Sequence, residues 1–418
     1  MPNTDWIGKF GYVASNQLLV EVCVFARNIL IARFIGAETL GEFIFLVLSM
    51  RLFTMSTDLA AERHIMQARE ADLPRALSAA HFTARLRGIV LASMLILMGL
   101  HNVHTISFMS YFILAMGAVL SGLTHQGYRL KQRSLNFRPA LYVEGVTTIF
   151  GALAIYIVVN AAPTLEAVCA CVLAQAVVQA SLSHILAEQK YATNANKADI
   201  KKLLHFGLPL LATGVAMFWS MQGERILLSA ILPADEFAHF SMMFQLALVP
   251  ILVMSRMMLT IGLPYLASLK HDWIEFERRL GQLHIAAYVA AFGFAGCFVI
   301  FVNPVLDILF GADFRSELLL VLLVGIAQAL RLCRAPQSIA AQALGQTDIP
   351  FKANLVRVAA ALTAAASVFA GGSITALLAI ACFGEGIAWA TQGLLFSLRN
   401  RAALRTVSPQ LRAQEILQ

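Results

Sequence analysis

Apolar segments about 20 residues long recur along the whole chain and are separated by short polar breaks. Such segments cross a bilayer as helices, because a helix satisfies all of its backbone hydrogen bonds internally. Only 13% of the residues are charged and 59% are hydrophobic, whereas a soluble domain has about 25% charged residues. The sequence therefore predicts an all-α polytopic membrane protein with about twelve transmembrane helices. The expected spans are 10–32, 40–57, 84–101, 106–125, 139–160, 164–186, 205–231, 237–265, 281–302, 316–334, 351–370 and 374–397.

Lysine and arginine concentrate on alternate loops, which sets the orientation, since cytoplasmic loops carry an excess of basic residues. The opposite face carries only Arg33 and Arg315. Both termini are therefore expected in the cytoplasm. This topology also accounts for the net charge of +7, so we expect no nucleic-acid partner. The residues assigned to the cytoplasmic face are Lys9, Arg63, Arg69, Arg75, Arg85, Arg87, Arg129, Lys131, Arg133, Arg138, Lys190, Lys197, Lys201, Lys202, Lys270, Arg278, Arg279, Arg331, Arg334, Lys352, Arg357, Arg399, Arg401, Arg405 and Arg412.

The sequence offers no constellation of catalytic residues. Loops on the opposite face, such as 160–164 and 232–236, are too short to hold an external reaction site. The six cysteines lie in or beside apolar segments without a CxxC pair, which is typical of packing residues. No GxxxxGK[ST] motif is present. We therefore expect a protein that is not an enzyme and has no metal site or cofactor.

Two segments half a chain apart resemble each other. VFARNILIARFIGAETLGEF (24–43) aligns without gaps on MQGERILLSAILPADEFAHF (221–240). The alignment pairs the first predicted hairpin with the seventh and eighth spans, so both halves would run in the same direction. It predicts two six-helix lobes related by a parallel internal repeat, although chance similarity of apolar helices is an alternative. The expected division is a lobe at 1–187, a cytoplasmic linker at 188–204, a lobe at 205–397 and a basic cytoplasmic tail at 398–418.

Four arginines that are assigned to neither face lie inside the predicted spans, on the first, second, seventh and eighth helices. They are Arg27, Arg51, Arg225 and Arg256. An arginine at a helix centre costs about 2.5–3.5 kcal/mol on insertion scales, so these side chains are expected to avoid lipid. On the first helix Glu21 and Asn28 share one arc with Arg27, and on the eighth Gln245 shares a face with Arg256. These faces are expected to line a polar cavity.

The alternative is that the arginines form structural ion pairs. Glu21, Glu144 and Glu224 are available partners, and Glu224 precedes Arg225 directly. The same three carboxylates are candidates for coupling to an ion gradient. Arg27, Arg51 and Arg256 have no acidic residue three or four positions away, which favours a cavity role for them. A cluster of guanidinium groups in such a cavity favours an anion, and phosphate or diphosphate matches its geometry.

The chain as a whole resembles the polysaccharide (O-antigen type) flippases of the multidrug/oligosaccharidyl-lipid/polysaccharide exporter superfamily. The resemblance is carried by ARNILIARFIGAETLGEFIFLVLS (26–49), ADIKKLLHFGLPLL (198–211), ILFGADFR (308–315) and ALGQTDIPFKANLV (343–356). It implies translocation of an undecaprenyl-diphosphate-linked oligosaccharide, an O-antigen or exopolysaccharide repeat unit, across the bacterial inner membrane by alternating access. In related peptidoglycan-precursor flippases essential arginines lie on helices one, two and eight, where this chain has Arg27, Arg51 and Arg256.

The resemblance also implies lipopolysaccharide or other polysaccharide biosynthesis as the setting, with membrane lipids and the polysaccharide polymerase machinery as expected partners. The main alternative is a cation-coupled multidrug exporter of the same superfamily, in which Glu21 would be the coupling residue. Four arginines inside the spans argue against a cationic substrate. A membrane scaffold or an enzyme is a third alternative, and it predicts that removing Arg27 or Arg256 alters stability more than activity.

Overall fold

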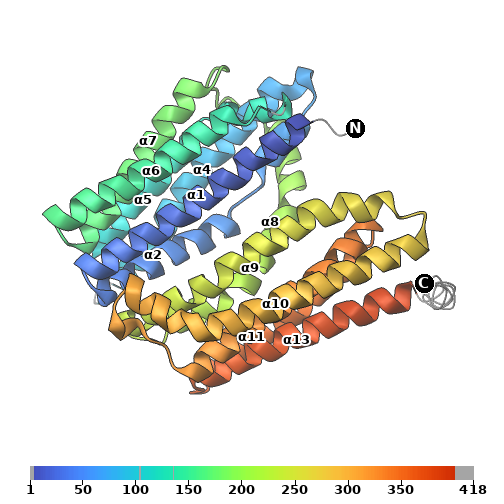
Figure 1. Ribbon diagram of the computed structural model, residues 1–418. Helices are drawn as coiled ribbons and strands as arrows, with labels where there is room; N and C mark the ends of the chain where they lie inside the picture. The colour runs from blue at the N-terminus through green and yellow to red at the C-terminus, as the bar shows by residue number, and fades with distance from the viewer. Residues whose placement is uncertain (1–3, 103–104, 135, 401–418) are drawn as a thin grey trace, which may run out of the picture. The chain divides into compact units, whose positions relative to one another are not determined.

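The computed structural model describes residues 4–102, 105–134 and 136–400, and for residues 4–18 it describes the helix without the side chains. These residues form helices and no strand (Figure 1). The long helices are α1 (Thr4–Phe34), α2 (Ala37–Ser56), α4 (Leu73–His101), α5 (Phe108–Gly122), α6 (Arg138–Ala161), α7 (Leu165–Leu186), α8 (Lys197–Ser229), α9 (Ala234–Ser268), α10 (Trp273–Leu309), α11 (Leu318–Ala343), α12 (Asp348–Phe369) and α13 (Ile374–Arg399). The shorter elements are α3 (Ala61–Gln67), η1 (Glu70–Asp72), η2 (Gln126–Ser134) and η3 (Ala312–Phe314).

The described helices confirm an all-α polytopic membrane protein. Ten are long and apolar enough to span a bilayer, or eleven if α5 and η2, bent by 48°, form one span. The predicted first span lies within α1, part of whose side chains are outside the described residues. A count of twelve spans therefore stays a prediction.

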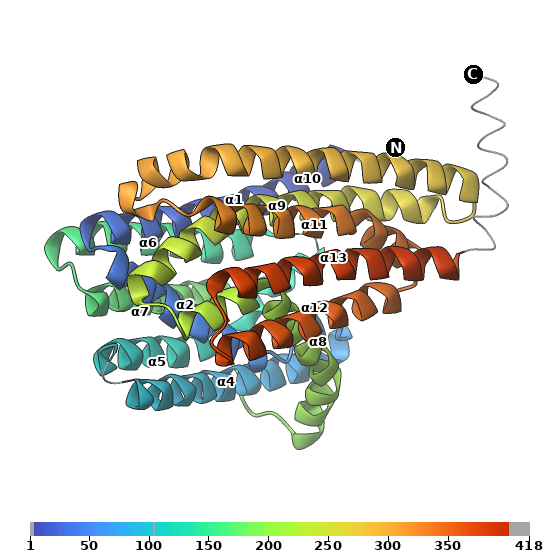
Figure 2. The same cartoon turned by 90° about the horizontal axis from the view of Figure 1, so that it is seen from below.

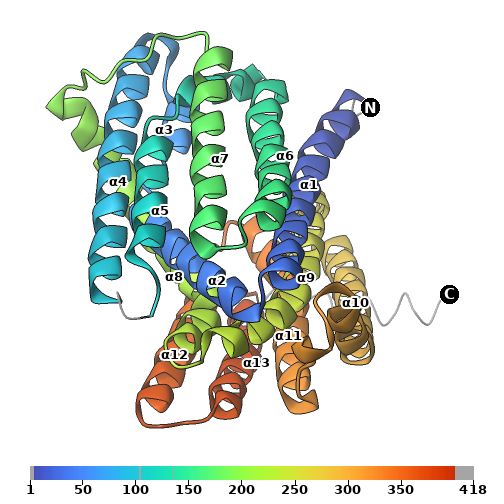
Figure 3. The ribbon, with the colours of Figure 1, turned by 90° about the vertical axis from the view of Figure 1, so that its left-hand side faces the viewer.

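The chain separates into two compact units, Met1–Phe218 with Pro233–Ala238 and Trp219–Leu232 with His239–Gln418, here called the N-terminal and C-terminal units. In the N-terminal unit α4 packs on α5, α5 on α7, α7 on α6 and α6 on α1 (Figure 3). In the C-terminal unit α10 packs on α11, α11 on α13 and α13 on α12 (Figure 2). The order α4–α5–α7–α6 thus recurs as α10–α11–α13–α12, as expected if the halves are repeats.

Close packing of α4 on α5 depends on two glycines. A Cβ atom on Gly88 would lie 2.9 Å from the carbonyl oxygen of Ala118, and one on Gly122 would lie 2.8 Å from that of Ala84. Any larger residue would push these backbones apart, and small residues allow such close helix contacts in membranes. The two glycines therefore set the spacing of this helix pair.

Three arginines assigned from the sequence to a cytoplasmic loop lie within helices instead. Arg331 and Arg334 belong to α11 and Arg357 to α12, and the loop between these helices is only 344–347. The assignment to a loop was wrong, because basic residues were counted as loop residues even at the ends of the predicted spans 316–334 and 351–370, whereas their assignment to the cytoplasmic face stays a prediction. The segment between α7 and α8 is likewise shorter than expected, since α8 begins at Lys197. Residues 401–418 of the predicted tail lie outside the described residues, and the division into lobes, linker and tail stays a prediction.

Candidate functional site

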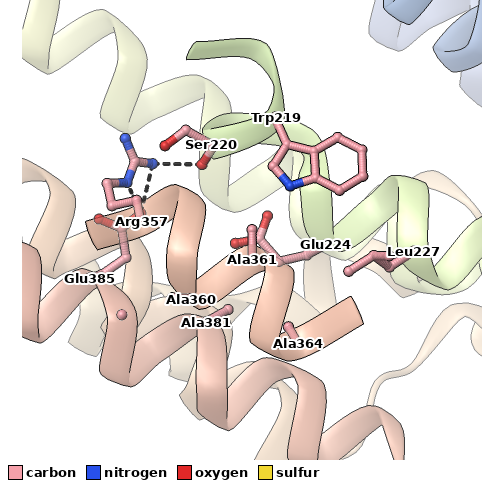
Figure 4. A pocket seen from close by; sticks show the side chains of 11 residues that line it. Trp219, Ser220, Glu224, Leu227, Arg357, Ala360, Ala361, Ala364, Ala381 and Glu385 are labelled. Atoms are coloured by element: carbon pink, nitrogen blue, oxygen red, sulfur yellow. Dashed lines mark hydrogen bonds and ion pairs between the residues drawn. The ribbon is translucent and has the colours of Figure 1, made fainter. Parts of the chain in front are cut away.

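A buried network of charges lies at the centre of the C-terminal unit and joins three of its helices. Arg331 of α11 donates through Nε to Oε1 of Glu385 on α13, at 2.5 Å. Arg357 of α12 donates to the same oxygen from Nε at 2.8 Å, and its Nη2 lies 2.7 Å from that oxygen as part of the ion pair (Figure 4). The side chains of these three residues are only 4–6% exposed. Glu385 is therefore the hub of this network.

The network also holds the end of α8. Nη2 of Arg331 donates to Oε1 of Glu224 at 3.3 Å. The backbone carbonyl of Ser220 accepts from Arg331 at 3.2 Å and from Arg357 at 2.6 Å. Two arginines thus connect α8 to α11 and α12 through one carboxylate and one carbonyl group.

The cluster carries an excess of positive charge. Arg334 lies close enough to interact electrostatically with Glu385 and donates to Oδ1 of Asn354 at 3.1 Å. With Arg334 included, three guanidinium groups face the carboxylates of Glu385 and Glu224. With three guanidinium groups and two carboxylates, the cluster has a net positive charge and therefore an electrostatic preference for an anion.

A small cavity borders the network (Figure 4). Its volume is about 20 Å³, and Trp219, Ser220, Glu224, Arg357 and Glu385 line it together with alanines of α12 and α13. This space suits about one water molecule. Oε2 of Glu224 and Oε2 of Glu385 are buried and make no hydrogen bond within the described part of the chain. Both acceptors are available to water or a proton there.

The N-terminal unit contains a second site, built around Arg27 of α1. The guanidinium carbon of Arg27 lies 4.8 Å from the centroid of the fully buried Phe43 ring on α2, a cation–π contact. Arg51 of α2 is exposed and close enough to interact electrostatically with Arg27. Asn28, 2% exposed, follows Arg27 in the chain. Two like charges are therefore brought together beside a buried aromatic ring.

Arg27 has no carboxylate partner among the described residues, and its Nε atom is buried without a hydrogen bond. Glu21, the acidic residue that shares its helix face, is half-buried. Arg27 therefore keeps a buried donor that has no acceptor among the described side chains.

The remaining predicted residues have varied environments. Arg225 is 7% exposed and donates to Oε1 of Gln222 at 3.1 Å and to Oγ of Ser241 at 3.5 Å. Its neighbour Glu224 pairs with Arg331 instead. Arg256 is exposed on α9.

The other two polar residues predicted from the sequence are Glu144 and Gln245. Oε1 of Glu144 accepts from Arg129 at 2.9 Å, and Arg129 also pairs with Glu62. Gln245 is half-buried on α9. Glu144 therefore belongs to a separate, partly exposed group of charges in the N-terminal unit.

Sequence reasoning missed the residues at the centre of the C-terminal network. Arg331 and Arg357 were assigned to a loop, and Glu385 was not considered. The signal for Glu385 was present, because it lies in the middle of the apolar segment 374–397. The criterion applied to the four arginines, a charge inside a predicted span, also selects this carboxylate.

The fold is that of transporters of the MOP superfamily. An inward-facing multidrug resistance MATE family transporter matches with a TM-score of 0.69 and 12% identity, over 93% of this chain and 96% of that chain. The lipid II flippase MurJ, in an inward closed conformation, matches with a TM-score of 0.72 and 14% identity, over 93% and 87% of the two chains. A third match is a MOP superfamily transporter from Pyrococcus furiosus whose binding pocket has reverse polarity. Its TM-score is 0.59 and its identity 13%, over 94% of this chain and 96% of that chain.

Residues 30–318 match the model of the polysaccharide biosynthesis protein family. The chain belongs to this family of membrane proteins. No curated protein sequence matches it.

Proposed function

We propose that this protein is a flippase that moves an undecaprenyl-diphosphate-linked oligosaccharide, an O-antigen or exopolysaccharide repeat unit, across the bacterial inner membrane by alternating access. Membership of the polysaccharide biosynthesis family and the fold shared with MurJ and MATE transporters support a membrane transporter. The observation that carries the substrate assignment is Arg27, whose buried Nε has no acceptor among the described residues while Arg51 adds a second positive charge. Such a site favours an anion over an organic cation.

A diphosphate fits this arrangement chemically. Its oxygens accept paired hydrogen bonds from the planar guanidinium group, and the interaction strengthens where water is scarce. The headgroup of a lipid-linked sugar cannot cross hydrocarbon unaided, whereas its polyprenyl chain is already soluble there. We propose Arg27 and Arg51 as diphosphate ligands, with Arg225 and Arg256 as substrate-binding residues of the C-terminal unit.

The experiment that tests this function is deletion of the gene in its host. Lipid-diphosphate-linked oligosaccharide is expected to accumulate on the cytoplasmic leaflet, because it is still synthesised and no longer moved. Leaflet-selective labelling of the sugar measures this accumulation. Complementation with the wild-type gene is expected to restore the normal distribution.

The competing function makes a different prediction for the same strain. A cation-coupled multidrug exporter would leave the lipid-linked sugar distribution unchanged and make the deletion strain sensitive to cationic compounds. That pair of results would overturn the flippase assignment and make Glu21 the next residue to test.

We further propose that Glu224 couples transport to protons. Its Oε1 is held by Arg331, whereas its Oε2 is buried beside the small cavity and makes no hydrogen bond to the part of the chain that the structure describes. Protonation would weaken the contact with Arg331 and loosen the end of α8.

In proteoliposomes, a pH gradient is expected to change wild-type flipping on the order of 10-fold, and Glu224→Gln is expected to lose this response. Glu236→Gln, an exposed carboxylate on α9, is the control, and an unaltered response in Glu224→Gln would exclude the coupling role.

A further inference from the structure

Three histidines and a tyrosine from four segments of the N-terminal unit contact one another through the edges and tilted faces of their rings. His81 is on α4, His125 precedes η2, His184 is near the end of α7, and Tyr191 belongs to the segment 187–196 that connects α7 to α8. The ring centroids of His81 and His125 are 4.6 Å apart, and those of His125 and His184 are 5.2 Å apart. Tyr191 lies 4.3 Å from His81 and 4.8 Å from His184. None of these groups has a role in the flippase site.

The hydrogen bonds of His81 require its neutral form. Its Nε2 accepts from the backbone N–H of Gln126 at 3.1 Å, so the ring proton must be on Nδ1. Nδ1 then donates to the carbonyl oxygen of Ala192 in the connecting segment, at 3.0 Å. A doubly protonated ring cannot accept from Gln126, so protonation breaks the first of these bonds.

The hydrogen bonds of His125 also require a neutral ring, but here Nδ1 is the acceptor and Nε2 is the donor. Its Nδ1 accepts from the backbone N–H of Gly127 at 2.9 Å, and its Nε2 donates to the carbonyl oxygen of Gln189 at 2.9 Å. His184 donates from Nε2 to the carbonyl oxygen of Leu123 at 3.0 Å. Two neutral imidazoles thus attach the backbone of the connecting segment to the rest of the N-terminal unit.

The charged side chains around these histidines do not favour the protonated, positively charged form of the ring. Arg85 of α4 donates to Thr193 at 3.0 Å and is the nearby cation. The carboxylate of Glu188 pairs with Lys131 of η2 at 2.7 Å. Burial raises the pKa of the Tyr191 hydroxyl, opposed by Arg85, so this group stays uncharged. The electrostatic partners of His81 and His125 among titratable groups are the other histidines.

We propose that His81 and His125 form a pH-sensitive clasp that holds the connecting segment 187–196 and releases it when the cytoplasm becomes acidic. An imidazole in solvent takes up a proton near pH 6.5. In the clasp each added proton displaces a backbone N–H or places like charges about 5 Å apart. The docked state is therefore fully stabilised above that pH and loses stability as the pH falls below it. Release frees the start of α8, so the clasp links cytoplasmic pH to the conformational freedom of the transporter.

Hydrogen exchange of the full-length protein in nanodiscs tests the clasp, because His81 and His125 directly protect the amides of Gln126 and Gly127. After correction for intrinsic exchange, a peptide covering 124–128 is expected to exchange on the order of 10-fold faster at pH 5.5 than at pH 7.5. The segment 310–317, which has no histidine, is expected to show no such change. Equal protection of 124–128 at both pH values in the wild type would overturn the proposal.

A double variant separates titration from docking. In His81→Gln/His125→Asn the amide oxygens take the places of Nε2 and Nδ1 as acceptors, and neither side chain titrates. The variant is expected to protect 124–128 at pH 7.5 and to keep that protection at pH 5.5. His271→Gln, an exposed histidine between α9 and α10, is expected to behave as wild type. An acid response retained in the double variant would rule out these rings as the sensor. The readout does not use transport, so it stands apart from the test of the flippase function.

Discussion

Replacing Glu385 by glutamine is expected to destabilise the C-terminal unit by about 3–5 kcal/mol, the usual cost of removing one partner from a buried ion pair. The substitution keeps the shape of the side chain and removes only its charge. Arg331 and Arg357 would then remain buried with Glu224 as the nearest carboxylate. Thermal unfolding of the purified protein in detergent should show a decrease in Tm on the order of 10 °C.

Two further variants identify the cause of that decrease. Glu317→Gln removes an exposed carboxylate from the start of α11, and its Tm is expected to stay close to wild type. In Arg357→Met/Glu385→Met a charge is removed from each side of the network, so Arg331 keeps Glu224 and the loss is expected to be smaller than for Glu385→Gln. A Glu385→Gln protein as stable as wild type would show that the network is not a stabilising centre.

Replacing Arg27 by alanine is expected to reduce flipping by about 30-fold or more, because truncating one partner of a buried charged hydrogen bond costs about 2–5 kcal/mol. Arg27→Lys keeps the charge and loses the planar fork, so it should recover only part of the activity. Complementation of the deletion strain, followed by leaflet-selective labelling, measures both variants at matched expression.

The thermal stability of the Arg27 variants must be measured together with their flipping activity, because Arg27 also contacts the buried Phe43 ring. A scaffold role predicts a lower Tm for Arg27→Ala, whereas a ligand role predicts lost flipping at nearly unchanged Tm. Arg75→Ala, which removes an exposed arginine of α4, serves as the control for loss of a basic residue. Wild-type flipping by Arg27→Ala would remove it from the substrate site.

The helix ends show both the strength and the limit of prediction from the sequence. The segments 139–160, 164–186 and 374–397 were predicted within about 2–4 residues of α6, α7 and α13, because uninterrupted apolar residues define their length. The end of α11 was missed because Arg331 and Arg334 interrupt its apolar run. These charges are tolerated inside the helix only through partners from other helices, which hydropathy does not contain.

The sequence by itself determined that the chain forms apolar membrane helices and that Arg27 lies inside a span without an acidic neighbour, and it indicated that the two halves are similar. These properties follow from composition and from spacing along one helix. Only the tertiary structure decided that Glu224 pairs with Arg331 and not with adjacent Arg225, and that Glu385 joins α11 to α12. Contacts between helices depend on which helices pack and how each is rotated, and residues such as Glu224 and Arg331 are 107 positions apart in the sequence.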